Sequence, residues 1–152
     1  MQVAGPLVKT LDLSENWCRS YEGLSQALLG LTKLTTLRLE QFQGLTGQGL
    51  SKIVNACSHT LTTFDLTCSE VSGELGGIQP KAIERLYLAY CRSDGNLFGL
   101  PALPVESLQE LDISGGSQPF RRAGEGLSLS NIVSIKVRIC HMHLVFKLKG
   151  IT

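Results

Sequence analysis

The chain has 152 residues, a length that suits one domain large enough to bury a core. Hydrophobic residues make up 43% of it and charged residues 18%, which excludes a wholly disordered chain. The formal net charge of +1 argues against long-range attraction to nucleic acid or to an anionic membrane, and no apolar run reaches the roughly 18–20 residues of a membrane-spanning helix.

One pattern recurs along the chain: apolar residues at positions one, four and six of a segment, then Asn, Cys or another residue at position nine. It begins at Val8 and returns near residues 34, 61, 83, 108 and 132, so the intervals are 22 to 27 residues. Apolar and polar residues alternate within each segment, which is typical of a half-buried strand. Six such segments predict a repeat protein built on short strands. In chain order they are VKTLDLSEN, LTTLRLEQF, LTTFDLTCS, IERLYLAYC, LQELDISGG and IVSIKVRIC.

The chain between the strands changes character near residue 70. Two apolar quartets with helical spacing follow the first two strand segments, with Ser20 and Thr46 as predicted N-caps. Further along, residues 72–82, 93–107 and 115–126 are rich in Gly and Pro, so we predict loops or tight turns there. The helical quartets are Leu24, Ala27, Leu28 and Leu31, and Leu50, Ile53, Val54 and Cys57.

Residues 8 to about 142 resemble the leucine-rich-repeat family, in its ribonuclease-inhibitor-like or cysteine-containing subclass. The resemblance implies a single α/β solenoid domain over residues 1–152 with about six repeats. It also implies a curved parallel sheet on the concave face, with helices and then loops on the convex face. In this family the ninth position is usually Asn or Cys, whose side chain serves the buried turn after the strand.

The ninth positions are irregular in this chain. Three of them fit the family pattern and three depart from it, so we do not expect a regular asparagine ladder. Each repeat is too small to bury its own apolar face, so stability should come from stacking on neighbours. The fitting residues are Asn16, Cys91 and Cys140, and the departing ones are Phe42, Ser69 and Gly116. The predicted core is Leu11, Leu13, Leu37, Leu39, Phe64, Leu66, Leu86, Leu88, Leu111, Ile113, Ile135 and Val137.

The side chains between these core positions should form the concave face. They mix both signs of charge and include Tyr and Arg, which are enriched where protein interfaces hold their energy. We therefore predict a non-catalytic protein–protein interaction module, a recognition or accessory subunit of a larger assembly. The alternative is a solvated face of alternating charge. The predicted partner-binding residues are Arg38, Asp65, Arg85, Tyr87, Tyr90, Asp112 and Arg138.

The ends of the repeat array lack an obvious polar capping unit, because the first strand segment starts only seven residues after Met1. A bare terminal repeat exposes apolar surface and a strand edge. We therefore expect another subunit, or further chain, to cover at least one end.

The number and spacing of the cysteines indicate the cellular compartment. There are five, an odd number, and no C-x-x-C pair occurs. This favours reduced thiols in an intracellular protein, cytoplasmic or organellar. The alternative is an extracellular or cell-surface recognition domain cut from a longer secreted protein, which the Ser-Gly segments after Val71 and Cys91 favour.

Neither catalysis nor metal binding is predicted. Residues 140–143, Cys-His-Met-His, contain possible ligands, but a structural zinc site needs four ligands and no second cluster exists. No nucleophile elbow, phosphate-binding loop or dinucleotide fingerprint is present. We expect no cofactor and no enzymatic activity.

Overall fold

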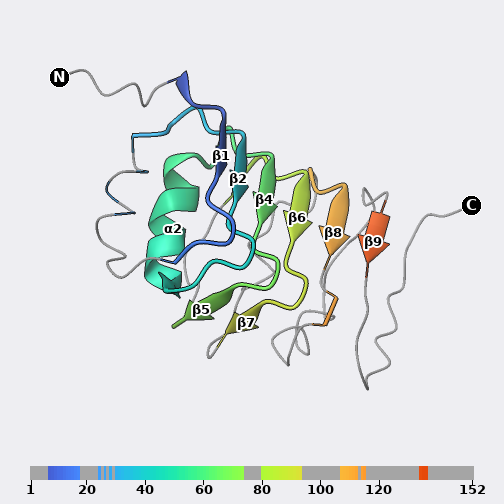
Figure 1. The fold of residues 1–152 in the computed structure, drawn as a ribbon. Helices are drawn as coiled ribbons and strands as arrows, with labels where there is room; N and C mark the ends of the chain where they lie inside the picture. The colour runs from blue at the N-terminus through green and yellow to red at the C-terminus, as the bar shows by residue number, and fades with distance from the viewer. Residues whose placement is uncertain are drawn as a thin grey trace, which may run out of the picture.

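The protein is a mixed α/β structure whose main element is a parallel sheet (Figure 1). The computed structural model describes residues 7–17, 24, 26, 28, 30–73, 80–93, 107–112, 114–115 and 134–136. Six strands form the sheet in the order β1-β2-β4-β6-β8-β9, and every neighbouring pair is parallel. The strands are β1 (Thr10–Asp12), β2 (Thr36–Arg38), β4 (Thr63–Asp65), β6 (Arg85–Tyr87), β8 (Glu110–Asp112) and β9 (Ser134–Lys136).

The pairing of the six strands matches the pattern that recurs in the sequence. The apolar residue in the middle of each strand pairs with the equivalent residue of its neighbour, as Leu37 does with Phe64. The backbone ladder continues past the strand ends, where Leu66 N donates to Tyr87 O at 2.8 Å. The predicted alignment of the six segments is therefore confirmed at each strand pair.

Every described strand of this sheet from β1 to β8 is followed by a turn residue with positive φ. Glu15, Gln41, Cys68 and Tyr90 have φ of 59°, 54°, 58° and 55°, and Gly115 has 67°. A non-glycine residue in this left-handed region costs roughly 1–2 kcal/mol, so the surrounding structure must stabilise it. Backbone hydrogen bonds between neighbouring turns stabilise these residues: the backbone N–H of Gln41, for example, donates to Thr67 O at 2.8 Å.

A second, smaller parallel sheet follows these turns. It has the order β3-β5-β7, with strands β3 (Leu45–Thr46), β5 (Glu70–Ser72) and β7 (Arg92–Ser93). This sheet was not predicted from the sequence, which placed Ser72 and Ser93 in loops. Its strands form because neighbouring turns bring their backbones together.

Helix α2 (Gly47–Ala56) packs on the apolar side of the large sheet (Figure 1). Thr46 is its N-cap, as predicted: the Thr46 hydroxyl accepts a hydrogen bond from Gly49 N at 3.4 Å. The predicted apolar quartet is confirmed, because Leu50, Ile53, Val54 and Cys57 are all buried.

The quartet predicted for the preceding repeat is described only in part. Leu24 and Leu28 are helical, and Leu28 is buried while Leu24 is half-buried. Ser20 and Ala27 lie outside the described residues.

Of the ninth positions that fit the family pattern, Cys91 is buried as the pattern implies, but Asn16 is not. Asn16, which fits the pattern, is exposed, and its amide donates to Leu13 O and Ser14 O within its own turn. Ser69, which departs from it, is buried, and its hydroxyl donates to Leu39 O and accepts from Phe42 N at 3.0 Å. The bridge between neighbouring turns is thus made by Ser69. Cys140 and Gly116 lie outside the described residues.

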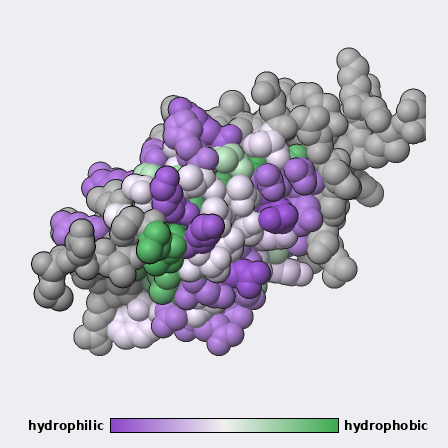
Figure 2. Space-filling model, turned by 90° about the horizontal axis from the view of Figure 1, so that it is seen from above, coloured by the Kyte–Doolittle hydropathy of each residue, from purple (hydrophilic) through white to green (hydrophobic). Residues whose placement is uncertain are grey.

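The core runs through the stacked strands and is densest at the middle ones. Leu11 and Leu13, predicted as core, are only partly buried, because β1 has one strand neighbour in the described sheet. Burial of Ile113, Ile135 and Val137 lies outside the described part. From above, the described surface is mostly hydrophilic with one compact hydrophobic patch (Figure 2). The fully buried members of the predicted core are Leu37, Leu39, Phe64, Leu66, Leu86, Leu88 and Leu111.

No helix among the described residues is long and apolar enough to cross a bilayer. Most of residues 93–107 and 115–126, where loops are predicted, lie outside the described residues.

Candidate functional site

The polar side of the six-stranded sheet, which we call the sheet face, carries five of the predicted partner-binding residues: Arg38, Asp65, Arg85, Tyr87 and Asp112. Side chains at the third strand position form its central row, and side chains at the first strand position form the row beside it. Arg138 lies outside the described residues. The central row is Asp12, Arg38, Asp65, Tyr87 and Asp112, followed in register by Lys136, and the second row is Thr10, Thr36, Thr63, Arg85 and Glu110.

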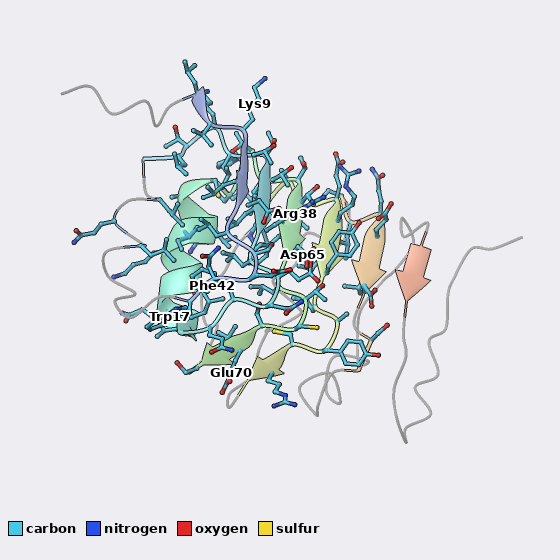
Figure 3. The ribbon with its side chains drawn as sticks, in the orientation of Figure 1. Lys9, Trp17, Arg38, Phe42, Asp65 and Glu70 are labelled. Atoms are coloured by element: carbon cyan, nitrogen blue, oxygen red, sulfur yellow. The ribbon has the colours of Figure 1, made fainter. Side chains whose placement is uncertain are left out.

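The N-terminal part of the sheet face is solvated. Arg38 lies 3.9 Å from Asp12, and the two side chains are 56% and 50% exposed (Figure 3). An exposed ion pair at this distance contributes little to stability, because water and salt screen it. Hydrogen bonds from Ser14 hold the pKa of Asp12 below its ordinary value. Arg38 is therefore free to exchange this contact for a partner's acidic group.

Aspartates on the sheet face are oriented by the turn that follows their strand. Asp65 Oδ1 accepts from Thr67 N at 2.9 Å, and Asp112 Oδ1 accepts from Ser114 N at 3.0 Å. In each case the carboxylate completes a local turn of the kind that Asp favours. In each aspartate one carboxylate oxygen accepts this hydrogen bond, which fixes the orientation of the carboxylate group.

Tyr87 forms a side-chain hydrogen bond across the sheet face. Its hydroxyl donates to Glu110 Oε2 at 2.6 Å, across from β6 to β8. Burial, followed by this hydrogen bond and the charge of Glu110, raises the pKa of Tyr87 to about 12. Arg85, in the same strand, donates from Nε to Thr63 Oγ1 at 3.1 Å.

Three residues that alternate with the predicted core positions, and so should lie on the solvated face, are buried: Thr63, Ala89 and Ser114. The Arg85 side chain reaches Thr63, which accounts for the first. Ala89 and Ser114 lie in turns whose backbones are joined, since Tyr90 N donates to Ser114 O at 2.6 Å. Fewer side chains of the sheet face are therefore accessible to a partner than the sequence predicts.

The link between Tyr87 and Glu110 leads to a pH prediction. The fold favours the neutral phenol, so the contribution of Tyr87 to stability is present below its ordinary pKa of 10 and is lost as the pH rises toward about 12. Glu110→Gln removes a charge that raises this pKa, and we expect Tyr87 to ionise at lower pH in that variant. Alkaline titration of tyrosinate absorbance measures this, with Tyr87→Phe identifying the component. Identical titrations of Glu110→Gln and the unmodified protein would contradict the prediction.

Tyr90 does not lie in either row of the sheet face. It occupies the left-handed turn position after β6, is 55% exposed, and its ring lies against Gly115. A Cβ at Gly115 would come within 2.3 Å of the Tyr90 ring, so only glycine permits this contact. Tyr90 is therefore a fixed aromatic group at the edge of the face.

No sequence pattern pointed to Trp17, the sole tryptophan. It is 62% exposed, and its backbone forms a parallel bridge with Gln43. Trp17 lies near helix α2 and strand β5 (Figure 3), so it is an exposed aromatic residue apart from the predicted set.

The described residues offer no group of three His, Cys, Asp or Glu side chains that could hold a metal ion. The Cys-His-Met-His segment at residues 140–143 lies outside them. Burial raises the pKa of Cys57 to about 11 and that of Cys91 to about 12, which disfavours the reactive thiolate. These two thiols act as small apolar groups of the core.

The described fold and face define the class of this protein: a mixed α/β protein with a parallel sheet, one face of which displays ordered charged and aromatic side chains. Comparison of the chain with protein-family models, with curated proteins and with solved structures finds no significant match. What can be inferred about function therefore rests on the sheet and its side chains.

Proposed function

We propose that this protein is a leucine-rich-repeat solenoid of about six repeats and a non-catalytic protein-interaction module. Its partner binds the sheet face, which forms the concave side of the solenoid. The observation that carries this proposal is the row of register neighbours Asp65, Tyr87 and Asp112, held by hydrogen bonds to turns and to Glu110. The repeat pattern of the sequence and the parallel order of all six strands support the solenoid.

The sheet face is suited to binding because its side chains are ordered before a partner arrives. Association loses less conformational entropy when the contacting side chains are already fixed. Tyr87 and Tyr90 are each held by a contact within the protein, through Glu110 and Gly115. Aromatic residues of this kind, with Arg38 close by in the central row, are the usual anchors of an interface.

Affinity purification of the intact protein with crosslinking, followed by identification of what is crosslinked, tests the proposal. We expect crosslinks from a protein partner to residues beside the sheet face. With that partner in hand, Tyr87→Ala combined with Tyr90→Ala should weaken binding by about 2 kcal/mol or more, roughly thirtyfold in Kd. Calorimetry or surface plasmon resonance measures the change.

Lys52→Ala provides a matched control, because Lys52 is exposed on helix α2, on the other side of the sheet. This variant should bind as the unmodified protein does. Unchanged binding by the double tyrosine variant, with its fold intact, would show that the partner does not use the sheet face.

We place the protein inside the cell, cytoplasmic or organellar, with another subunit or further chain covering an end of the array. The described cysteines Cys57, Cys68 and Cys91 are free thiols, which supports this compartment.

The second candidate is an extracellular recognition domain. The Ser-Gly segments after Val71 and Cys91 are the feature that favours it, and strands β5 and β7 lie at these segments. Thiol alkylation read by mass spectrometry separates the two: five free thiols support the first and a disulfide supports the second.

A further inference from the structure

Two cysteines from neighbouring repeats lie in adjacent turns, which follow β4 and β6. Cys68 has the left-handed conformation in the first turn, with φ of 58°, and Cys91 lies in the second. Backbone hydrogen bonds join the two turns on both sides of this pair. Cys68 N donates to Ala89 O at 2.8 Å, and Arg92 N donates to Ser69 O at 2.9 Å. The two cysteines are thus diagonal neighbours on adjacent backbones.

The backbone spacing at this pair suits a disulfide. Just beyond the turns, Glu70 of β5 is in register with Arg92 of β7, which places Cys91 opposite Ser69, the residue after Cys68. Neighbouring strands lie about 4.8 Å apart and consecutive Cα atoms about 3.8 Å, so the Cα atoms of diagonal neighbours are about 6 Å apart. Most disulfides join cysteines at this separation.

The two thiols differ in their access to solvent. Both are free, but Cys68 is exposed and Cys91 is only 2% exposed. Burial raises the pKa of Cys91 to about 12, and the charge of a Cys68 thiolate adds to this shift, which agrees with their proximity. An exposed thiol meets an oxidant first, and a second thiol beside it can then form the disulfide.

We propose that Cys68 and Cys91 form a reversible disulfide when the protein meets a hydroperoxide. The Cys68 sulfur attacks the peroxide, and the O–O bond breaks. This gives a sulfenic acid on Cys68 and an alcohol, or water from hydrogen peroxide, which takes the proton of the Cys68 thiol. The Cys91 sulfur then attacks the Cys68 sulfur, so that the S–S bond forms and the S–O bond breaks. The Cys91 proton leaves with the hydroxyl group as water, and the two electrons that the thiols lose reduce the hydroperoxide.

This site is distinct from the features on which the proposed function rests. Neither thiol belongs to the two rows of the sheet face. The bond forms on oxidation of free thiols, so it also differs from a disulfide already present in the native protein, which the thiol count above detects. Oxidation of this pair can therefore be tested independently of partner binding.

Peptide mapping of the full chain after oxidation tests the proposal. The reduced, folded protein is treated with an equimolar amount of hydrogen peroxide, the remaining thiols are alkylated, and the chain is digested. Trypsin cleaves after Lys81 and Arg85, so Cys68 and Cys91 fall on different peptides. We expect these two peptides to be linked and the protein to lose the mass of two hydrogen atoms. Dithiothreitol should reverse both changes.

Substitution of each cysteine separates the two steps. Cys91→Ser introduces the residue that the preceding repeat has at the equivalent position, Ser69, which makes it a conservative change. In this variant the sulfenic acid on Cys68 should accumulate and be captured by dimedone several times more strongly than in the unmodified protein. In Cys68→Ser, Cys91 should keep its thiol. Circular dichroism confirms that both variants are folded.

The unfolded chain provides a control for the role of the fold. Cys57 is 11 residues from Cys68 in sequence, whereas Cys91 is 23 residues away. Closure of the shorter loop costs less entropy, so oxidation in concentrated urea should favour the bond between Cys57 and Cys68. Fragmentation of the linked peptides assigns the bond in each case.

Three results with the folded protein would overturn the proposal. One is a Cys68 thiol that stays free under peroxide. Another is a bond from Cys68 to Cys57 or to any cysteine other than Cys91. The third is equal capture by dimedone in the unmodified protein and in Cys91→Ser, because Cys91 would then not be the thiol that forms the disulfide.

Discussion

Replacing Leu66 by alanine is expected to lower the free energy of unfolding by about 2–5 kcal/mol. Leu66 is fully buried and follows strand β4, which lies between β2 and β6 in the large sheet. Its removal takes away apolar contacts and leaves a cavity that neighbours on both sides cannot readily fill. Urea denaturation followed by circular dichroism measures the loss, which is a large share of a stability of about 5–15 kcal/mol.

Leu11→Ala is the matched control, because it deletes the same atoms from the end strand β1. Leu11 is only partly buried, so we expect less than half the effect. Equal losses at Leu66 and Leu11 would contradict a core that is densest at the middle strands.

Replacing Ser69 by alanine is expected to cost about 1–3 kcal/mol, a large effect for the loss of one oxygen atom. The buried Ser69 hydroxyl donates to Leu39 O and accepts from Phe42 N at 3.0 Å, in the turn of the preceding repeat. Alanine would leave the carbonyl without this donor in a site closed to water. The same denaturation experiment measures the change.

Ser69→Cys serves as the comparison, because Cys91 occupies the equivalent position of the next repeat and is buried there. A thiol is of similar size and is a weak donor, so this variant should lose less stability than Ser69→Ala. If Ser69→Ala were as stable as the unmodified protein, the hydroxyl would not be what joins the two turns.

Much of the fold is predictable from the sequence because the pairing of the strands follows the repeated sequence pattern. Each strand segment has the same spacing of apolar residues, so equal positions of neighbouring repeats pair in the sheet, as Asp65 does with Tyr87. Helix α2 is predictable for a similar reason, since its apolar spacing and the N-cap Thr46 are local features.

The candidate site is predictable only as a set of positions. The sequence places Arg38, Asp65, Tyr87 and Asp112 in one row, and the strand pairing agrees. The hydrogen bond from Tyr87 to Glu110 depends on rotamers of two side chains from different repeats, which no local pattern encodes. Contact between the Tyr90 ring and Gly115 depends in the same way on how closely two turns stack.

By itself the sequence determined which residues form the six strands of the large sheet, which side of each of them is apolar and where helix α2 begins, because these follow from local spacing and capping. Only the tertiary structure decided that Ser69 joins two turns, that Asn16 is exposed and that short strands form a second sheet. Those features arise where backbones of neighbouring repeats meet, and each depends on the distance and orientation between segments more than 20 residues apart.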